Sequence, residues 1–191
     1  MANIHIMSDF VVNFYNNKIE YRSLSNFWEC DVVITVGDTV KLYETGEHCF
    51  HGEKYRRTGE NTRDENRRKV LLSYAETFLK PSKYTTAALA KKNGGKKGLL
   101  LSQDELKVWD SINFDLQTAI CKWKLENYKA VRDDLIKSET KILIHPALRC
   151  SLDKLEKSRV WEGRARIKDG EIVILGKNQL GNIWMNLRKF I

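Results

Sequence analysis

The sequence predicts an α+β fold that is predominantly helical, with a small antiparallel β element, in a single domain over residues 1–191. Three observations predict it: short segments of alternating residues near the start, helical spacing of apolar residues over most of the remainder, and a length that suits one domain. The composition, with 42% hydrophobic residues and only 2 Pro, excludes a disordered or collagen-like chain.

The β element is expected near the start of the chain. Residues 10–15 and 31–36 have the composition of strands, and 40–43 alternates apolar and polar residues as a half-buried return strand does. Gly37-Asp38 between them is a two-residue turn signal, so a hairpin is predicted over residues 31–43. The mixed polar and aromatic residues 21–28 indicate a loop.

Helices are predicted next. Residues 47–57 form the first, with Thr45 as a nearby cap, and residues 63–79 form the second, which ends before Pro81-Ser82. A short helix is expected over 83–91.

The second half is expected to alternate helices with short strands. Residues 91–98 contain three glycines and are predicted not to be helical, whereas 104–134 carries apolar residues along one face and is predicted to be one long central helix. Short strands are expected at 142–144 and 171–175, and a terminal helix at 179–190.

Charge and hydropathy restrict the partners and the compartment. With 33 Lys+Arg against 25 Asp+Glu, the chain has a net charge of +8, which suits a polyanion or a phosphorylated substrate. No apolar run reaches the roughly 20 residues of a membrane span, and residues 1–9 lack the pattern of a signal peptide. We therefore expect a soluble, cytoplasmic protein with no membrane partner.

The cysteines are expected to be reduced and buried, because they lie far apart without a CxxC pair: Cys30, Cys49, Cys121 and Cys150.

One helical face carries a set of reactive side chains. At 100° per residue, Glu47, His51 and Lys54 fall within about 60° of one another and place a carboxylate, an imidazole and an amine on successive turns. A solvated, salt-bridged helix face has the same spacing, so both interpretations stay open. His48, Cys49 and His51 have no distant second pair of ligands, and no metal is expected.

Three further patches suit an anionic ligand or a base. The glycines and lysines of 91–98 are typical of an anion-binding nest or of a flexible loop. Residues 176–182 place Gly-Lys-Asn at a helix start, which suits a phosphate or is a plain helix start capped by Asn178. Residues 161–164 form the third patch. Several aromatic side chains are candidates for stacking on a base or for the core: Tyr21, Phe27, Trp28, Trp109 and Trp161.

Taken in order, these patches resemble a known family. From about residue 12 to the C-terminus the chain is similar to the NADAR, or YbiA-like, family of N-glycosidases. The motifs that carry the resemblance are Ser25-Asn26-Phe27, residues 47–55 (EHCFHGEKY, against E-H-x-F-Q-A-x-K-F), Trp109 before a long helix, Trp161-Glu162-Gly163 (against W-G), and residues 176–188 (against G-x-N-x-L-G-x-x-L-M-x-x-R).

The resemblance implies a small α+β domain that hydrolyses the bond between a ribose and a base or amino-heterocycle, without a cofactor. Its preferred implication is removal of ADP-ribose from guanine bases in nucleic acid. Two alternatives stay open, namely hydrolysis of phosphoribosylamino-pyrimidine intermediates of riboflavin biosynthesis and a non-catalytic module that binds ADP-ribose or a nucleotide. The expected partner is accordingly ADP-ribosylated nucleic acid or a phosphoribosyl small molecule.

The resemblance also implies roles for individual residues. Glu47, Lys54 and Trp109 match the catalytic positions, with Glu47 as the carboxylate and Lys54 as either a charge beside it or a nucleophile. The residues implied to bind substrate are Ser25, Asn26, Phe27, His48, His51, Lys96, Trp161, Gly176, Lys177, Asn178, Leu180 and Gly181.

The chain departs from the family pattern at two places. Family members carry an aspartate three residues before the W-G tryptophan, where this chain has Ser158, and Glu162 is inserted after Trp161. Either Glu162 or Glu156 replaces that carboxylate, or it is not needed. The family's Gly-Arg is Gly95-Lys96 here, which keeps the charge but loses the planar, two-bond grip on phosphate.

Overall fold

The computed structural model describes residues 11–14, 20–148, 150–151, 153–155 and 160–191. The chain divides into two compact units, one of residues 26–124 and one formed by residues 1–25 together with 125–191. Each unit is described by itself, and the prediction of a single domain stays a prediction. None of the helices in the described part of the chain is both long and apolar enough to cross a bilayer.

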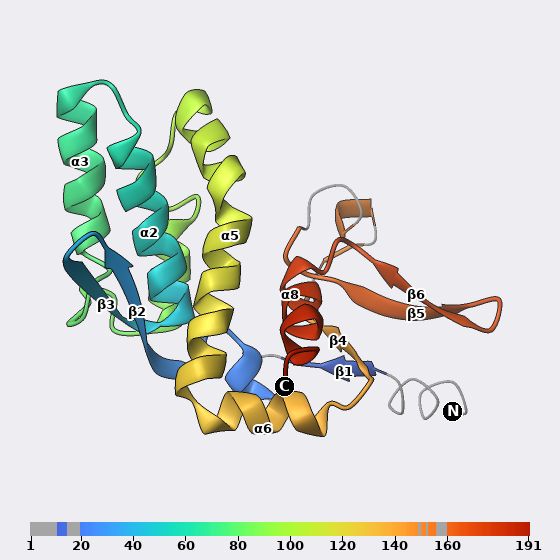
Figure 1. The fold of residues 1–191 in the computed structure, drawn as a ribbon. Helices are drawn as coiled ribbons and strands as arrows, with labels where there is room; N and C mark the ends of the chain where they lie inside the picture. The colour runs from blue at the N-terminus through green and yellow to red at the C-terminus, as the bar shows by residue number, and fades with distance from the viewer. Residues whose placement is uncertain (1–10, 15–19, 149, 152, 156–159) are drawn as a thin grey trace. The chain divides into compact units, whose positions relative to one another are not determined.

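The unit of residues 26–124 begins with an antiparallel hairpin of β2 (Glu29–Val36) and β3 (Thr39–Thr45) (Figure 1). Alternate residues of β2 are buried, as expected for a strand with one solvated face. Helix α2 (Gly46–Glu60) follows β3 directly and packs against both strands. Thr45 caps the helix, since its hydroxyl accepts a hydrogen bond from the His48 backbone N–H at 3.2 Å.

Three more helices complete this unit. Helix α3 (Glu65–Glu76), capped by Asp64, and helix α4 (Ala87–Gly94) both pack against α2. Helix α5 (Gln103–Asn127) passes three residues beyond the end of the unit. The unit's core joins buried aromatic and aliphatic side chains of all these elements, among them Tyr43, Tyr55, Leu71, Phe78, Leu116 and Ile120.

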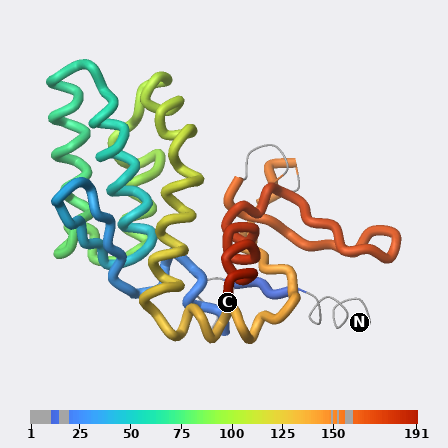
Figure 2. Tube along the Cα trace, viewed as in Figure 1, coloured from blue at the N-terminus to red at the C-terminus, as the bar shows by residue number. Residues whose placement is uncertain are grey.

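The second unit is built on a parallel pair of short strands, β1 (Val11–Asn13) and β4 (Ile142–Ile144). They lie side by side although their paired residues are 131 positions apart in the sequence, as the blue and orange segments of the tube show (Figure 2). Helix α8 (Gln179–Arg188) packs against β4 through a buried face that includes Leu180, Ile183 and Trp184. The Trp184 indole N–H donates to the Leu24 carbonyl at 2.9 Å.

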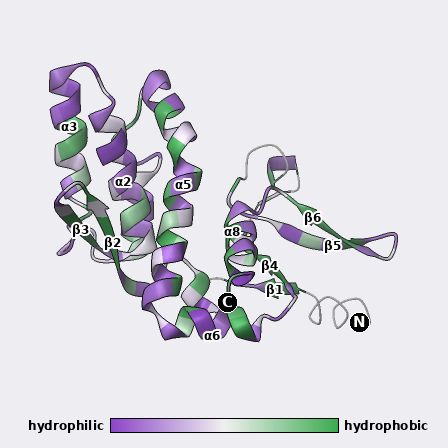
Figure 3. Cartoon of the chain, viewed as in Figure 1, coloured by the Kyte–Doolittle hydropathy of each residue, from purple (hydrophilic) through white to green (hydrophobic). Residues whose placement is uncertain are grey.

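The described part of this unit also includes a short 3-10 helix, an α-helix and a hairpin. Helix α6 (Lys129–Lys137) packs against η1 (Arg22–Leu24), and β5 (Arg164–Lys168) pairs antiparallel with β6 (Glu171–Leu175). Hydrophobic residues dominate β4, whereas the turn joining β5 and β6 is hydrophilic (Figure 3). The buried part of β5 is Ala165, which packs with Val11 and Ile144.

Most of the predicted elements are confirmed. The α+β class with a predominance of helix is correct, as are the hairpin, the turn at Gly37-Asp38, the Thr45 cap and the strands at 142–144 and 171–175. The four cysteines are free and buried, as expected.

Three predicted helix boundaries are wrong. The short helix expected over 83–91 begins only at Ala87, after the Thr86 cap. The expected helix over 104–134 is interrupted at Tyr128, which has an extended conformation with φ −127° and ψ 113°. The apolar spacing continues across the interruption, but α6 is held by η1, where the Ser23 hydroxyl donates to the Ala130 carbonyl at 3.3 Å. Helix α4 also continues through residues 91–94, which were expected not to be helical, because Gly94 packs on α2.

The β structure is more extensive than the sequence indicates. Strand β5 was not predicted, since its charged residues mask its pairing with β6. The pairing of β1 with β4 is parallel, in addition to the expected antiparallel element. A 3-10 helix, η1, lies in the segment 21–28 that was expected to be a loop. The β1–β4 pair joins two segments that are distant in the sequence, and composition does not reveal such a pairing.

Candidate functional site

The first turn of α2 holds Glu47, which is 7% exposed. Its backbone N–H donates to the Asn26 carbonyl at 3.0 Å, so the loop before β2 covers the start of the helix. A carboxylate in the first helical turn is stabilised by the positive end of the helix dipole. The Glu47 side chain keeps 9% of its surface exposed, so a solvent molecule or a ligand can reach it.

The Glu47 carboxylate is paired with the imidazole one turn later. His51 Nε2 lies 3.2 Å from Glu47 Oε1. The i and i+4 spacing on one helical face makes this contact, as the sequence predicts. The pair is nearly buried, which distinguishes it from the solvated helix face that was the alternative interpretation.

Lys54 lies two turns beyond Glu47 on the same face of α2. Its ammonium donates to the Gly94 carbonyl at the end of α4, with an Nζ to oxygen distance of 2.9 Å. Burial lowers the pKa of Lys54 below its ordinary value of 10.5. No carboxylate lies within 4 Å of its ammonium among the residues described. A lysine of this kind releases its proton more readily than a surface lysine does.

Trp109 on α5 contributes an aromatic wall beside this face. Its ring meets Phe50 of α2 edge-on, with 4.9 Å between ring centroids and an angle of 74°. The tryptophan is 9% exposed, and Phe50 is half-buried. Phe50 also contacts the His51 ring edge-on at 5.6 Å. Trp109 is therefore joined to the Glu47–His51 pair through one phenylalanine.

Asn26 is held by a partner that the sequence did not indicate. Its side-chain amide exchanges two hydrogen bonds with Gln117 of α5, at 2.8 and 3.0 Å. Both residues are buried. The reciprocal pair fixes the plane of the Asn26 amide next to the start of α2. Gln117 had no local signal, because it is one polar residue among many on a long helix.

His48 is occupied by the protein itself. Its Nδ1 lies 2.8 Å from the Thr45 hydroxyl and its Nε2 lies 2.6 Å from the Tyr84 carbonyl, and the residue is 1% exposed. Both ring nitrogens thus take part in holding α2 against the segment before α4. The structure places His48 in the framework of the unit, away from the exposed edge of the Glu47 face.

Phe27 and Lys96 are closer to the surface. Phe27 is half-buried, and the Lys91 ammonium lies 5.3 Å from the centre of its ring. Lys96 is exposed in the turn that follows α4. With Lys91, Lys92 and Lys97, which are also exposed, it forms a basic surface at the end of that helix.

The remaining predicted site residues lie in the other unit, and Asn178 is central among them. Its side chain is 1% exposed; Nδ2 donates to the Leu143 carbonyl at 2.8 Å, and Oδ1 accepts from the His145 N–H at 3.0 Å. The amide thus completes the free edge of β4 as a neighbouring strand would. Asn178 occupies the N-cap position of α8, as the plain helix start predicts, but with a left-handed backbone (φ +47°) and without a capping hydrogen bond from its side chain.

The start of α8 is already supplied with acceptors. The N–H groups of Asn178, Gln179 and Leu180 donate to the carbonyls of residues 162, 160 and 161, at 3.0, 3.1 and 3.4 Å. A phosphate at this helix start would have to compete with those carbonyls.

The other predicted site residues of this unit differ in exposure. Those that are buried are Ser25 and Leu180, those that are half-buried are Trp161 and Gly176, and Lys177 is exposed. Gly181 packs on the Leu143 carbonyl. Ser158 and Glu156 lie outside the described residues.

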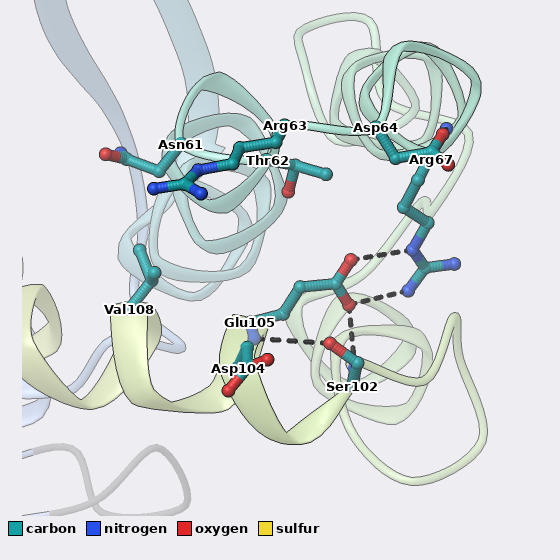
Figure 4. A pocket seen from close by; sticks show the side chains of 9 residues that line it. All are labelled: Asn61, Thr62, Arg63, Asp64, Arg67, Ser102, Asp104, Glu105 and Val108. Atoms are coloured by element: carbon teal, nitrogen blue, oxygen red, sulfur yellow. Dashed lines mark hydrogen bonds and ion pairs between the residues drawn. The ribbon is translucent and has the colours of Figure 1, made fainter.

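A separate groove lies at the far end of α2, lined by residues of α3 and α5 and of the segments before them (Figure 4). Its carboxylates are already engaged: Glu105 accepts two bonds from Arg67, at 2.7 and 2.8 Å, and Asp64 caps α3. The hydrogen bond from Arg67 lowers the pKa of Glu105. The groove's carboxylates are thus engaged by the protein itself, and none of the predicted site residues lines it. In the described part of the chain, no group of three or more His, Cys, Asp or Glu side chains suits a metal ion.

Comparison with known proteins finds similarity to a curated sequence and to a solved structure. No family model matches the chain. The sequence is 23% identical over 185 residues to N-glycosidase YbiA of Shigella boydii serotype 4 (strain Sb227), which covers 97% of this chain and 91% of that protein. The fold is similar to the NMR structure of the E. coli protein YbiA, with a TM-score of 0.56 and 23% identity, over 95% of this chain and 84% of that one.

Proposed function

The chain is YbiA-like in its fold and along nearly its whole sequence, and from this premise we propose that it is a hydrolase of N-glycosyl bonds. We further propose that it removes ADP-ribose from guanine bases in nucleic acid. The observation that carries the proposal is the Glu47 face of α2, where a nearly buried carboxylate, an imidazole and a lysine with a lowered pKa share one side of a helix.

The residue types of this face suit the reaction. When the base leaves with the bonding electron pair, positive charge develops on C1 and the ring oxygen of the ribose. An ionised carboxylate stabilises that charge best where water is excluded, and it also takes a proton from the attacking water. Glu47 is the carboxylate for both steps, because it is nearly buried and lies in the first turn of α2.

Lys54 has two possible roles in this scheme. As an ammonium it favours the ionised form of Glu47 by charge proximity. As a free amine it adds to C1 of the ring-opened ribose; the C1–N bond to the base then breaks, the base leaves with a proton, and water hydrolyses the imine formed between Lys54 and C1. Burial lowers the pKa of Lys54, which increases the fraction of free amine and favours the second role. Trp109 is proposed to stack on the base, which suits an indole next to a charged face.

The choice of nucleic acid as the substrate is supported by charge. The chain carries a net charge of +8, and exposed lysines gather at the end of α4 in the unit that holds Glu47. The phosphoribosylamino-pyrimidine substrate needs only one phosphate site. Incubation with guanine-ADP-ribosylated oligonucleotide and, separately, with riboflavin precursors distinguishes the two. Hydrolysis of only the precursors would overturn the nucleic-acid assignment, and binding of ADP-ribose without any hydrolysis would leave a binding module.

Glu47→Gln tests the assignment of the carboxylate. The amide keeps the shape of the side chain but carries no charge, so turnover should fall by about 10²–10⁴-fold while binding of the uncleaved oligonucleotide stays nearly unchanged. Glu65→Gln is the matched control, because the Glu65 side chain is 71% exposed on α3. Wild-type-like release of ADP-ribose by the Glu47 variant would remove this residue from the mechanism.

A further inference from the structure

The His51 ring has two nitrogens with different surroundings. Nε2 lies 3.2 Å from Glu47 Oε1. Nδ1 is buried and has no hydrogen-bond partner among the described residues. The ring is walled by Phe50, at 5.6 Å between centroids, by Phe78 at 6.4 Å, and by the backbone of Gly94. Only one of the two nitrogens therefore meets a group that can exchange a proton with it.

These surroundings select one protonation state of the pair. A proton on Nδ1 would be a buried donor without an acceptor, which is destabilising. That disfavours the doubly protonated ring. It also disfavours the reverse arrangement, in which a neutral Glu47 acid donates to Nε2 and the ring proton sits on Nδ1. The state that leaves no N–H of the ring unpaired is a neutral imidazole that donates its Nε2–H to an ionised Glu47 carboxylate, with the Nδ1 lone pair as the unpaired site.

Gly94, the last residue of α4, contacts both His51 and Lys54. A Cβ at this position would lie 2.0 Å from His51 Cγ and 2.2 Å from Nδ1, so only glycine lets the backbone pack against the ring. The carbonyl of the same residue accepts the Lys54 ammonium at 2.9 Å. One residue thus fixes the ring that orients Glu47 and the side chain of Lys54.

We propose that His51 is a positioning residue, held as the neutral Nε2–H tautomer by Gly94, and that it orients the Glu47 carboxylate toward the substrate. The role rests on the proposed function, because it is a role in that reaction. The tautomer does not rest on it, since it follows from the contacts of the ring alone.

The tautomer is tested in the free protein by NMR with ¹⁵N-labelled histidine. Long-range proton–nitrogen correlations at neutral pH should show His51 as a neutral ring with its proton on Nε2, and loss of that signal in His51→Gln assigns it. His48, which has polar partners at both nitrogens, is an internal comparison. A charged His51 ring, or one protonated at Nδ1, would overturn the inference whatever the enzyme does.

The positioning role is tested by three variants. His51→Met keeps the approximate size of the side chain but removes the N–H donor. This variant should lower kcat by about 10²-fold with little change in KM. His51→Gln supplies an amide N–H and should restore most of that loss. Gly94→Ala should displace the ring and lower kcat much more than Gly95→Ala, where a Cβ would meet only backbone, at 3.2 Å from the Lys91 carbonyl.

The outcomes separate the two proposals. Equal kcat values for His51→Met and His51→Gln would show that the N–H donor has no role and would overturn the positioning role. If the wild-type chain hydrolyses no ribosyl linkage, the proposed function fails, yet the NMR measurement still decides the tautomer. If His51→Met fails to fold, the comparison of Gly94→Ala with Gly95→Ala and the NMR measurement decide between a positioned ring and an inert one.

Discussion

Replacement of Asn178 by alanine should destabilise the unit formed by residues 1–25 and 125–191. The Asn178 amide is the partner of two buried backbone groups on the free edge of β4, the Leu143 carbonyl at 2.8 Å and the His145 N–H at 3.0 Å. Strand β1 does not serve these two groups, because it pairs along the opposite edge of β4. Asn178 also has a left-handed backbone, which asparagine tolerates better than alanine does.

The size of the effect follows from these contacts. Each backbone group left unpaired in the interior destabilises by about 1–3 kcal/mol. The left-handed conformation costs a further 1–2 kcal/mol or so for alanine, and nothing comparable for glycine. Asn178→Ala should therefore lower the free energy of unfolding by about 3 kcal/mol or more. The loss for Asn178→Gly should be about 1 kcal/mol smaller than the loss for Asn178→Ala.

The loss is measured by urea denaturation and by hydrogen exchange. Tryptophan fluorescence reports the unfolding transition, and exchange of the His145 amide, followed by NMR, reports the local contact. Asn182→Ala is the matched control in the adjoining helix α8, since Asn182 is exposed and its side chain donates to the backbone carbonyl of the exposed residue Lys177, at 3.0 Å. That control should change stability by no more than about 0.5 kcal/mol.

One pattern of results would refute this reasoning. If Asn178→Ala unfolds at the same urea concentration as the wild type and the His145 amide keeps its protection, the amide does not support β4. Weaker binding of ADP-ribose in the same stable variant would then assign Asn178 to the ligand, as the family resemblance implies.

Two further predictions concern α2. Glu53 is fully buried and accepts hydrogen bonds from Arg56, Arg57 and Tyr43, so Glu53→Gln should destabilise by about 3–5 kcal/mol at neutral pH in urea denaturation. Burial is the largest influence and by itself would raise the pKa of Glu53. The hydrogen bonds and charge of Arg56 together with the hydrogen bonds from Tyr43 and Arg57 outweigh it, so the pKa is lowered. The stabilisation by ionised Glu53 is therefore complete above pH 4.5 and is lost as pH falls through the lowered pKa, where variant and wild type should converge. A difference that grows in acid would contradict this sign. Borohydride added during turnover should trap a reduced adduct between Lys54 and the ribose C1, detectable by mass spectrometry and absent in Lys54→Met, whereas active enzyme without adduct would leave Lys54 a purely electrostatic role.

The extent of the sequence prediction follows the range of the interactions involved. The α2 helix, its Thr45 cap and the common face of Glu47, His51 and Lys54 follow from the 3.6-residue period and local capping chemistry. The β2–β3 hairpin likewise follows from alternation around a two-residue turn. All of these depend on residues within a few positions of one another.

The errors occur where a distant segment decides. The segment 91–98 contains three glycines and was predicted not to be helical, yet its first four residues are helical because Gly94 packs on the His51 ring 43 positions earlier in the chain. The interruption at Tyr128 accompanies the docking of α6 on η1, which lies at the other end of the sequence. Local propensity carries no information about either contact.

The sequence by itself determined which helix carries the carboxylate, the imidazole and the lysine, because a helical period places them on one face. The tertiary structure alone decided how each is held: the orphaned Nδ1 that sets the His51 tautomer, the Gly94 carbonyl that receives Lys54, and the β4 edge that occupies Asn178. The physical reason is that burial and hydrogen-bond partners come from segments that meet only in the folded chain. The same residue types would have a different chemistry on an isolated helix.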